Sequence, residues 1–262
     1  MNKARIMYNM TVEEIRQGLK ETQTVILPVG VVEQHGYHLP LGTDTHHAVE
    51  LARLASEQTG CFVLPPMNYS FSGGALPGTI NLPPQLYSLV LMEVCHSLVE
   101  QGFKNIVFLL GHGGTEFLQA SQDAAENFQR LNPRMEGVTV SIIKWWLLSE
   151  AYSHAHEESD FHAGKYETSL MLHWHPELVK LDRARLDKPH IMAMMAKDPD
   201  AFIAKTQAVD SEFIVPKMTQ HSEIEIGVMG NYAGASAELG KRIADEITVN
   251  VVAMIRQLQA LE

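Results

Sequence analysis

The sequence has 262 residues, of which 45% are hydrophobic and 19% charged, proportions of an ordinary soluble globular protein. This length suits one large α/β domain, and we expect residues 1–262 to form it. The formal net charge of −11 argues against nucleic acid or an anionic membrane as a partner, because both are themselves negatively charged. The N-terminus lacks the apolar segment of a signal peptide and no apolar run is long enough to span a membrane, so we expect a cytoplasmic protein.

Hydrophobic periodicity and turn residues predict strands and helices that alternate along the chain. The first helix begins with the capping-box pattern of Thr11 and Glu14. Continuous apolar runs predict buried strands at 24–29, 61–64, 105–110 and 138–143. Apolar residues that recur every third or fourth position, with suitable start and stop residues, predict helices at 43–58, 83–101, 116–131, 165–174 and 236–261.

Alternating strands and helices predict a three-layer α/β/α sandwich with a mostly parallel central sheet. The strand at 105–110 is the most hydrophobic, as expected of a central parallel strand that is buried on both faces. Glycine and proline in 68–82 indicate a long functional loop. We expect 188–220 to be irregular and 154–160, which includes His154 and His156, to form a solvated acidic loop or a lid.

The most informative stretch runs from Glu33 to Asp44, directly after the strand predicted at 24–29. Polar side chains just past the carboxyl end of a strand lie where open α/β sheets hold their ligands. Glu33 and His35 are two positions apart, so their side chains project to the same side of an extended segment. Asp44 follows a loop with several glycine and proline residues that can fold back over them. This ligand set suits Zn²⁺ or Mn²⁺, although a polar surface loop would carry similar residues.

The second candidate element is Gly111-His112-Gly113-Gly114, which follows the central strand. Flanking glycines let a backbone approach a ligand closely, which makes His112 a candidate metal ligand. Two alternatives remain: a glycine-rich turn that happens to contain a histidine, and a phosphate-binding loop at a helix start. The phosphate interpretation is weak because the Lys-Ser/Thr ending of a P-loop is absent.

The third candidate element comprises His162 and Glu167, at the start of the helix predicted at 165–174. His162 precedes the helix and Glu167 lies one turn inside it, so the two side chains can converge on one site. As alternatives, Glu167 is a first-turn carboxylate that only favours the helix dipole, and His162 is a capping or solvent-facing residue.

Several further residues each allow a functional and a structural interpretation. His46 and His47 follow Asp44, and either one of them faces the site or both occupy ordinary polar positions. Trp145 and Trp146 follow a strand, where they either wall a pocket or pack in the core. The two cysteines, at 61 and 95, lie in apolar patterns, and we expect buried free thiols.

Together the three elements resemble the creatininase (creatinine amidohydrolase) family. The resemblance extends over residues 25–255, and its first motif is highly specific. The matching segments are Glu33-Gln34-His35-Gly36, Leu39-Pro40-Leu41-Gly42-Thr43-Asp44, Gly111-His112-Gly113-Gly114, His162-Ala163-Gly164, Glu167-Thr168-Ser169, Gly230-Asn231-Tyr232 and Ala235-Ser236-Ala237-Glu238-Leu239-Gly240. The resemblance implies a three-layer α/β/α fold, one or two Zn²⁺ or Mn²⁺ ions per chain, and a homo-oligomer, commonly a hexamer.

Carried over by residue, the family's metal ligands match Glu33, His35, Asp44, His112 and Glu167, with Asp44 as the bridge. His162 matches a proton-transferring histidine. Creatininase itself continues His-Tyr-Glu where this chain has His112-Gly113-Gly114, so one ligand is lost. Either Glu167 is its best replacement, or the second metal binds more weakly or is absent. The missing aromatic residue, and Thr115 in place of asparagine, argue against creatinine as the substrate.

For function, the resemblance implies that a metal-activated hydroxide attacks the carbonyl of a small cyclic substrate, a cyclic amide or a related ring, while His162 transfers a proton. The main alternative is C–C hydrolysis of a cyclic keto-inositol at the same metal site. Two alternatives of other classes are a non-catalytic metal-binding scaffold and a nucleotide- or phosphate-binding protein that uses Gly111–Gly114.

Overall fold

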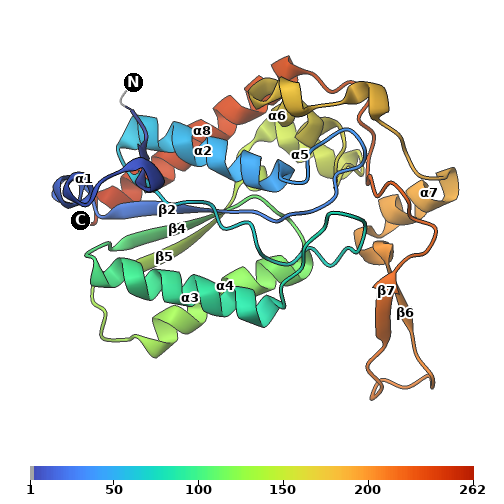
Figure 1. Ribbon diagram of the computed structural model, residues 1–262, viewed down its shortest axis with the longest axis horizontal. Coiled ribbons are helices and arrows are strands. Elements are labelled where there is room, and N and C mark those ends of the chain that lie inside the picture. Colours follow the sequence, from blue (N-terminus) through green and yellow to red (C-terminus); the bar gives the residue numbers. More distant parts are fainter. Residues whose placement is uncertain (1–2) are drawn as a thin grey trace.

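The computed structural model describes residues 3–262 of the chain (Figure 1). Its strands are β1 (Arg5–Ile6), β2 (Thr24–Val29), β3 (Phe62–Val63), β4 (Asn105–Leu110), β5 (Thr139–Lys144), β6 (Ile203–Thr206) and β7 (Lys217–Gln220). Its α-helices are α1 (Val12–Gly18), α2 (Thr43–Thr59), α3 (Pro84–Glu100), α4 (Thr115–Leu131), α5 (Glu150–Glu157), α6 (Lys165–Trp174), α7 (Pro189–Lys197) and α8 (Ala237–Gln259).

The central sheet has the strand order β1-β3-β2-β4-β5, and all its neighbouring strands are parallel. β2 and β4 lie side by side in the middle, with Val25 opposite Ile106 and Val29 opposite Leu110. Parallel strands end at the same edge of a sheet, so the loops after β2 and β4 start next to each other. The backbone N–H of Gly111 donates to the carbonyl of Val29 at 2.7 Å and joins the two strand ends.

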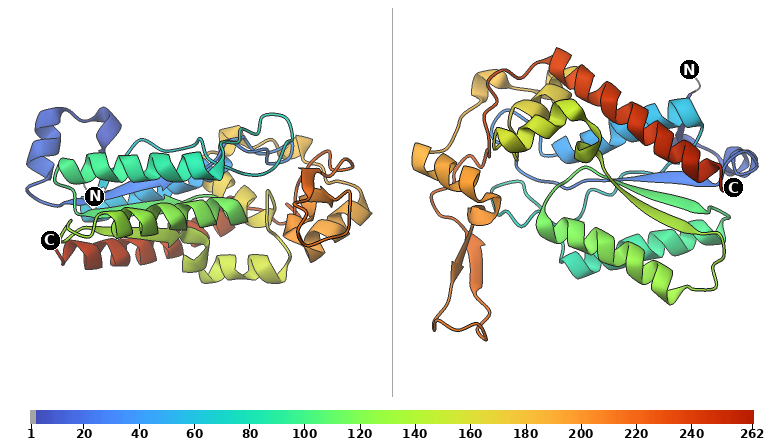
Figure 2. Two further views of the ribbon diagram at one scale, coloured as in Figure 1. Left: turned by 90° about the horizontal axis from the view of Figure 1, so that it is seen from below. Right: turned by 180° about the vertical axis from the view of Figure 1, so that it is seen from behind.

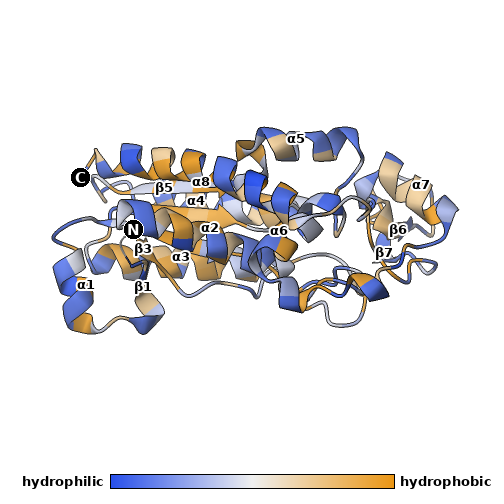
Figure 3. Ribbon diagram, turned by 90° about the horizontal axis from the view of Figure 1, so that it is seen from above, coloured by the Kyte–Doolittle hydropathy of each residue, from blue (hydrophilic) through white to orange (hydrophobic). Residues whose placement is uncertain are grey.

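Helices cover both faces of the sheet, with α2 and α8 on one side and α3 and α4 on the other (Figures 1 and 2). Alternate residues of the central strands separate into two buried clusters, as the period of two in a strand requires. Ile26 and Val107 pack in the cluster that includes residues of α2 and α8. Val25 and Ile106 pack in the cluster that includes residues of α3 and α4. In Figure 3 the apolar sides of the helices face the sheet, which confirms the predicted three layers.

Helix starts follow their sequence signals. In α1, Thr11 Oγ1 accepts from the N–H of Glu14 at 3.4 Å, and the Glu14 carboxylate accepts from the N–H of Thr11 at 2.6 Å, which confirms the capping box. In α8, Ser236 Oγ accepts from the N–H of Leu239 at 3.1 Å. Side chains at such positions satisfy backbone N–H groups that lack partners within the helix.

Two expectations are wrong. Residues 150–157 form α5 rather than part of a solvated loop, and Asp160 after it is buried. The segment 188–220 is not irregular, because it contains α7 and the antiparallel hairpin β6–β7, which projects from the rest of the chain in Figure 1. Across residues 3–262, no helix combines the length and apolar character that a bilayer crossing requires.

Candidate metal centre

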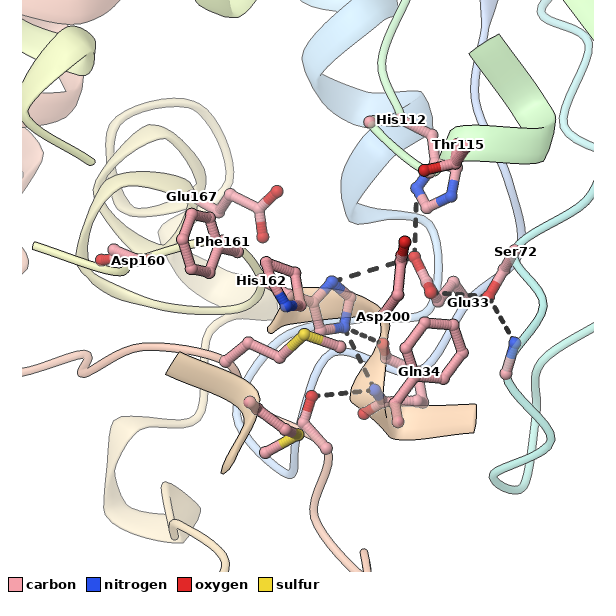
Figure 4. Close-up of a pocket in the computed structure, with 18 of the residues that line it drawn as sticks. Glu33, Gln34, Ser72, His112, Thr115, Asp160, Phe161, His162, Glu167 and Asp200 are labelled. Atoms are coloured by element: carbon pink, nitrogen blue, oxygen red, sulfur yellow. Dashed lines mark hydrogen bonds and ion pairs between the residues drawn. The ribbon is translucent and has the colours of Figure 1, made fainter. Parts of the chain in front are cut away.

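The six predicted site residues meet beside the carboxyl ends of β2 and β4, and Figure 4 shows four of them: Glu33, His112, His162 and Glu167. They come from three parts of the chain. The connection from β2 into the first turn of α2 supplies three residues, the loop after β4 supplies one, and the start of α6 supplies two. Each of the six is at most 8% exposed. They are Glu33, His35, Asp44, His112, His162 and Glu167.

Asp44 lies at the middle of the cluster. Its Oδ1 is 3.0 Å from His35 Nε2, and its Oδ2 is 2.9 Å from His112 Nδ1. The loop after β2 turns back on itself, because the N–H of Glu33 donates to the carbonyl of Leu41 at 3.0 Å. That return brings the first turn of α2 against the residues that follow β2. One carboxylate therefore faces two imidazoles that come from different strand ends.

Glu33 and Glu167 lie on different sides of this arrangement. Glu33 Oε2 is 3.3 Å from His112 Nδ1 and 3.9 Å from His162 Nδ1. Glu167 Oε2 accepts from the N–H of Ala163 at 2.7 Å and is 3.7 Å from His35 Nε2. His35 and His112 both face Asp44, and each has a second carboxylate within about 4 Å: Glu167 beside His35 and Glu33 beside His112. Glu167 therefore lies where a replacement for the lost ligand is needed.

The carboxylates give the cluster a strong affinity for positive charge. Burial opposes protonation of His35, but Asp44 chiefly, with Glu167 and Glu33, outweighs it and raises the pKa of His35 to about 10. In the same way, burial is outweighed by Glu33 and Asp44, which raise the pKa of His112 to about 9. Burial raises the pKa of Glu167, because its negative charge is poorly solvated there. A buried site with this balance binds either protons or metal ions.

The donor set fits divalent ions. Among residues 3–262, neither Glu33 Oε2 nor His112 Nε2 has a hydrogen-bond partner, although buried polar atoms are normally paired. Glu33, Asp44 and His112 offer ligand atoms that lie within 4.8 Å of one another, and so do His35, Asp44 and Glu167. Glu33, His35 and His162 form a third group of this kind. Asp44 is common to the first two groups, as a bridging carboxylate would be. Carboxylate oxygens and imidazole nitrogens suit Zn²⁺ or Mn²⁺.

Two histidine rings are oriented by backbone carbonyls. His35 Nδ1 is 3.1 Å from the carbonyl of Glu33, and His162 Nε2 is 2.7 Å from the carbonyl of Gln34. A carbonyl only accepts, so we assign a proton to that ring nitrogen in both residues, although the side-chain nitrogen of Gln34 also lies 3.1 Å from His162 Nε2. His35 Nε2 faces Asp44 Oδ1 at 3.0 Å, and a metal ion that displaced its proton would find this nitrogen available as a ligand. The unprotonated nitrogen of His162 is Nδ1, the atom that faces Glu33.

Sequence reasoning missed the residues that hold the ligands. Ser72 Oγ donates to Glu33 Oε1 at 2.6 Å and leaves Oε2 to face the centre. Ser72 belongs to the predicted functional loop 68–82, where nothing in the pattern distinguishes it from its neighbours. Gln34 lies in the first motif, and its side chain donates to the carbonyl of Gly227 at 3.1 Å, a contact between this loop and the C-terminal segment that no sequence pattern indicates.

The remaining histidines and tryptophans now have definite places. His47 is fully buried and packs against the rings of Trp145 and Trp174, which makes it a core residue. The ring of His46 lies 4.7 Å from that of His175. His154 is exposed and pairs with Glu157 at 3.2 Å on α5. The cavity into which the centre opens is lined in part by Trp145, Trp146 and His156.

The centre opens into a cavity of about 440 Å³. At its polar end lie Glu33, His112, His162 and Glu167. No lysine or arginine lines this cavity among the residues that the structure describes. The start of α4 after Gly114 therefore lacks a cationic side chain for phosphate, which counts against the nucleotide- or phosphate-binding alternative.

The fold places the chain among three-layer α/β/α proteins that hold their site at the carboxyl ends of parallel strands. The family model described as creatinine amidohydrolase, Creatininase, matches residues 8–255, and the chain belongs to that family.

One relative is the mycofactocin precursor peptide peptidase of Mycolicibacterium smegmatis, 30% identical over 90% of this chain and 85% of the relative. Another is the 3-dehydro-scyllo-inosose hydrolase of Thermotoga maritima, 29% identical over 65% of this chain and 56% of the relative. A solved structure described as Creatininase Mn has the same fold, with a TM-score of 0.75 at 21% identity over 98% of this chain and 99% of that one. The chain is thus a member of a family of hydrolases, which confirms the prediction of an enzyme.

Proposed function

We propose that this chain is a divalent-metal-dependent hydrolase that cleaves the C–N bond of a small amide. The observation that carries the proposal is the position of Asp44, whose two oxygens face His35 at 3.0 Å and His112 at 2.9 Å. A bridging carboxylate between two ligand groups is the feature that a pair of ions requires. The family resemblance in the sequence implies a cyclic amide as the substrate. The peptidase relative supports cleavage of an amide bond.

We assign the two ligand groups to two ions. Glu33, Asp44 and His112 would hold one, and His35, Asp44 and Glu167 would hold the other. When bound, Zn²⁺ or Mn²⁺ lowers the pKa of water towards 7 and polarises a carbonyl oxygen. Ser72 keeps the Glu33 carboxylate turned towards the centre, and the carbonyl of Glu33 keeps the His35 ring in place. Such outer contacts normally decide how well a ligand binds its metal.

His162 is the proposed proton-transferring residue. Its Nε2 lies 2.7 Å from the carbonyl of Gln34, so we assign the ring proton to Nε2, and Nδ1 is the nitrogen that accepts a proton and later donates it to the leaving nitrogen. Burial lowers the pKa of His162, which keeps the ring neutral and able to accept a proton at neutral pH. Nδ1 lies 3.9 Å from Glu33 Oε2, on the side of the cavity.

C–C hydrolysis of a cyclic keto-inositol is the alternative substrate chemistry, supported by the inosose hydrolase relative. It would use the same ligand groups and the same cavity. A non-catalytic metal-binding scaffold is the alternative of another class. The scaffold predicts that His162→Ala preserves the biological role of the protein and that no substrate is found.

The test combines metal analysis with a substrate panel. We expect elemental analysis to find two ions per chain, and we expect chelation to abolish hydrolysis of small cyclic amides and dipeptides until Mn²⁺ or Zn²⁺ is restored. His162→Ala should lose turnover while it retains its metal, and the exposed His154→Ala serves as the matched control. Full activity in metal-free protein would refute the proposal, and cleavage of inososes with no cleavage of any amide would favour the alternative chemistry.

A further inference from the structure

The cavity also has an apolar wall, which differs in character from the metal centre. Two of its residues come from the segment expected to be irregular, namely Met195 of α7 and Phe202 at the end of the following 3-10 helix (Pro199–Phe202). Leu76, Ile224 and Met229 complete the wall. Met195 and Ile224 are buried in a small apolar cluster, against which the other three pack while partly exposed.

This apolar wall begins directly beside the proposed proton-transferring residue. The N–H of His162 donates to the carbonyl of Met229 at 3.0 Å, and the N–H of Met229 donates back to the carbonyl of His162 at 2.8 Å. The side chain of Gln34 donates to the carbonyl of Gly227 in the same segment. A group attached to the scissile amide would therefore reach the wall without leaving the cavity.

The charges of the cavity restrict what this group can be. Glu33 and Glu167 face the metal centre, so the acidic residues that line the rest of the cavity are Asp160 and Asp200, and no lysine or arginine accompanies them among residues 3–262. A carboxylate or phosphate on the arm of a substrate would lie near these two carboxyl groups in a partly desolvated space, with no lysine or arginine to pair with it. A neutral or positively charged group meets no such barrier.

We infer that the wall formed by Leu76, Met195, Phe202, Ile224 and Met229 is an apolar subsite for an aliphatic or aromatic arm of an uncharged or cationic amide substrate. This inference rests on the proposed function and specifies its substrate class. A volume of about 440 Å³ lies in the range of drug-sized ligand pockets, which leaves room beyond a single small ring. Methionine side chains adapt to different apolar shapes, so the subsite accepts more than one arm.

Hydroxamates with arms of increasing length test the subsite on the metal-loaded protein. Acetohydroxamate, butyrohydroxamate and hexanohydroxamate share one metal-binding head, and calorimetry measures their dissociation constants. We expect affinity to rise about fourfold for each added methylene, the gain that burial of a CH₂ group provides. Adipic acid monohydroxamate, whose arm of similar length ends in a carboxylate, should bind more weakly than hexanohydroxamate.

Phe202→Ala should remove most of the advantage of hexanohydroxamate and leave acetohydroxamate unchanged. Phe213→Ala is the matched control, because Phe213 is 87% exposed and lies outside the cavity. Equal affinities for all three hydroxamates, or equal behaviour of the two variants, would overturn the subsite while the metal centre stands.

A second pair of probes keeps the subsite testable without metal. Hexanamide and acetamide carry no metal-binding group, and we expect metal-free protein to prefer hexanamide and to lose that preference in Phe202→Ala but not in Phe213→Ala. If no hydroxamate binds the metal-loaded protein, the proposed metal centre fails, and the two amides still decide the subsite. No preference for hexanamide would overturn it.

Discussion

At the scale of single residues, the carboxylate of Asp44 has three neighbours that act in the same direction. His35 and His112 face its two oxygens and lower its pKa well below the usual range despite burial. The first turn of α2 adds the positive end of a helix dipole. This lowered pKa favours the ionised form of Asp44 at neutral pH, as a bridging ligand requires.

We expect Asp44→Asn to reduce bound metal to one ion per chain or fewer and to lower the proposed hydrolysis by about a hundredfold or more. Loss of a contact to a ligand already costs about 10- to 100-fold in such sites, and Asn removes a charge from the ligand itself. Asp123→Asn on the exposed face of α4 is the matched control. Two ions per chain in Asp44→Asn, measured by elemental analysis, would show that Asp44 does not bridge them.

The two cysteines lead to a prediction about how fast their thiols react at pH 8. Both are free and buried as predicted, and burial raises the pKa of Cys61 to about 11 and of Cys95 to about 12. Free cysteine has a pKa of about 8.5, so at pH 8 the folded chain contains far less thiolate than the unfolded chain. We expect dithionitrobenzoate to react more than a hundredfold more slowly with native than with urea-unfolded protein. Comparable rates at pH 8 would mean that the thiols are accessible.

A site residue could be predicted from the sequence when it closely follows a predicted strand. Glu33, His35 and His112 could be proposed because each follows a recognisable buried strand, whose end defines where ligands bind. Ser72 could not, because its role depends on how a long loop folds back towards Glu33 over a separation of 39 residues. A periodic pattern carries no information about such a contact.

At the scale of elements, segments with continuous burial were predicted closely and exposed ones were not. β2, β4 and α6 have the predicted bounds, and each contains six consecutive buried residues. In α7 only Ile191 and Met195 are buried, and the strands of the hairpin β6–β7 contain no buried residue, so their sequences carry little signal. These short elements form much of the apolar wall, so the sequence located the metal centre better than the rest of the cavity.

Close approach between elements at the centre leads to a prediction about glycine. A Cβ at Gly111 would lie 2.1 Å from the carbonyl oxygen of Asp44, whereas a Cβ at Gly113 would have no described atom within 4 Å. We expect Gly111→Ala to push α2 away from the end of β4, to destabilise the fold by about 1–3 kcal/mol and to impair metal binding. Gly113→Ala, two positions along the same loop, is the control. Urea unfolding and metal content of the two variants decide the matter, and equal stabilities would contradict the close contact.

At the scale of the whole molecule, the arrangement of apolar residues along the central strands determines both the order of the layers and the position of the site. Alternate strand residues supply two cores, which leaves the strand ends free to carry polar loops. That much could be predicted from the sequence. The single domain over 1–262, the homo-oligomer and the cytoplasmic location remain predictions, because the packing of one chain does not determine them.

Metal binding should also contribute to the stability of the whole chain. Without ions, Glu33, Asp44 and Glu167 place three carboxyl groups in one buried cluster, which only protonation or the histidines can neutralise. An ion that binds the folded chain alone at about 100 times its dissociation constant stabilises it by about 2.7 kcal/mol.

For a chain of this size, 1 kcal/mol corresponds to about 2–4 °C, so we expect chelation to lower the melting temperature by about 5–10 °C. Added Mn²⁺ or Zn²⁺ should restore it, because the ions bind the folded state far better than the unfolded chain. Asp44→Asn should respond much less, while Asp123→Asn should respond as the parent protein does. Scanning calorimetry with and without chelator measures the shift, and an unchanged melting temperature in the parent protein would mean that no ion occupies this cluster.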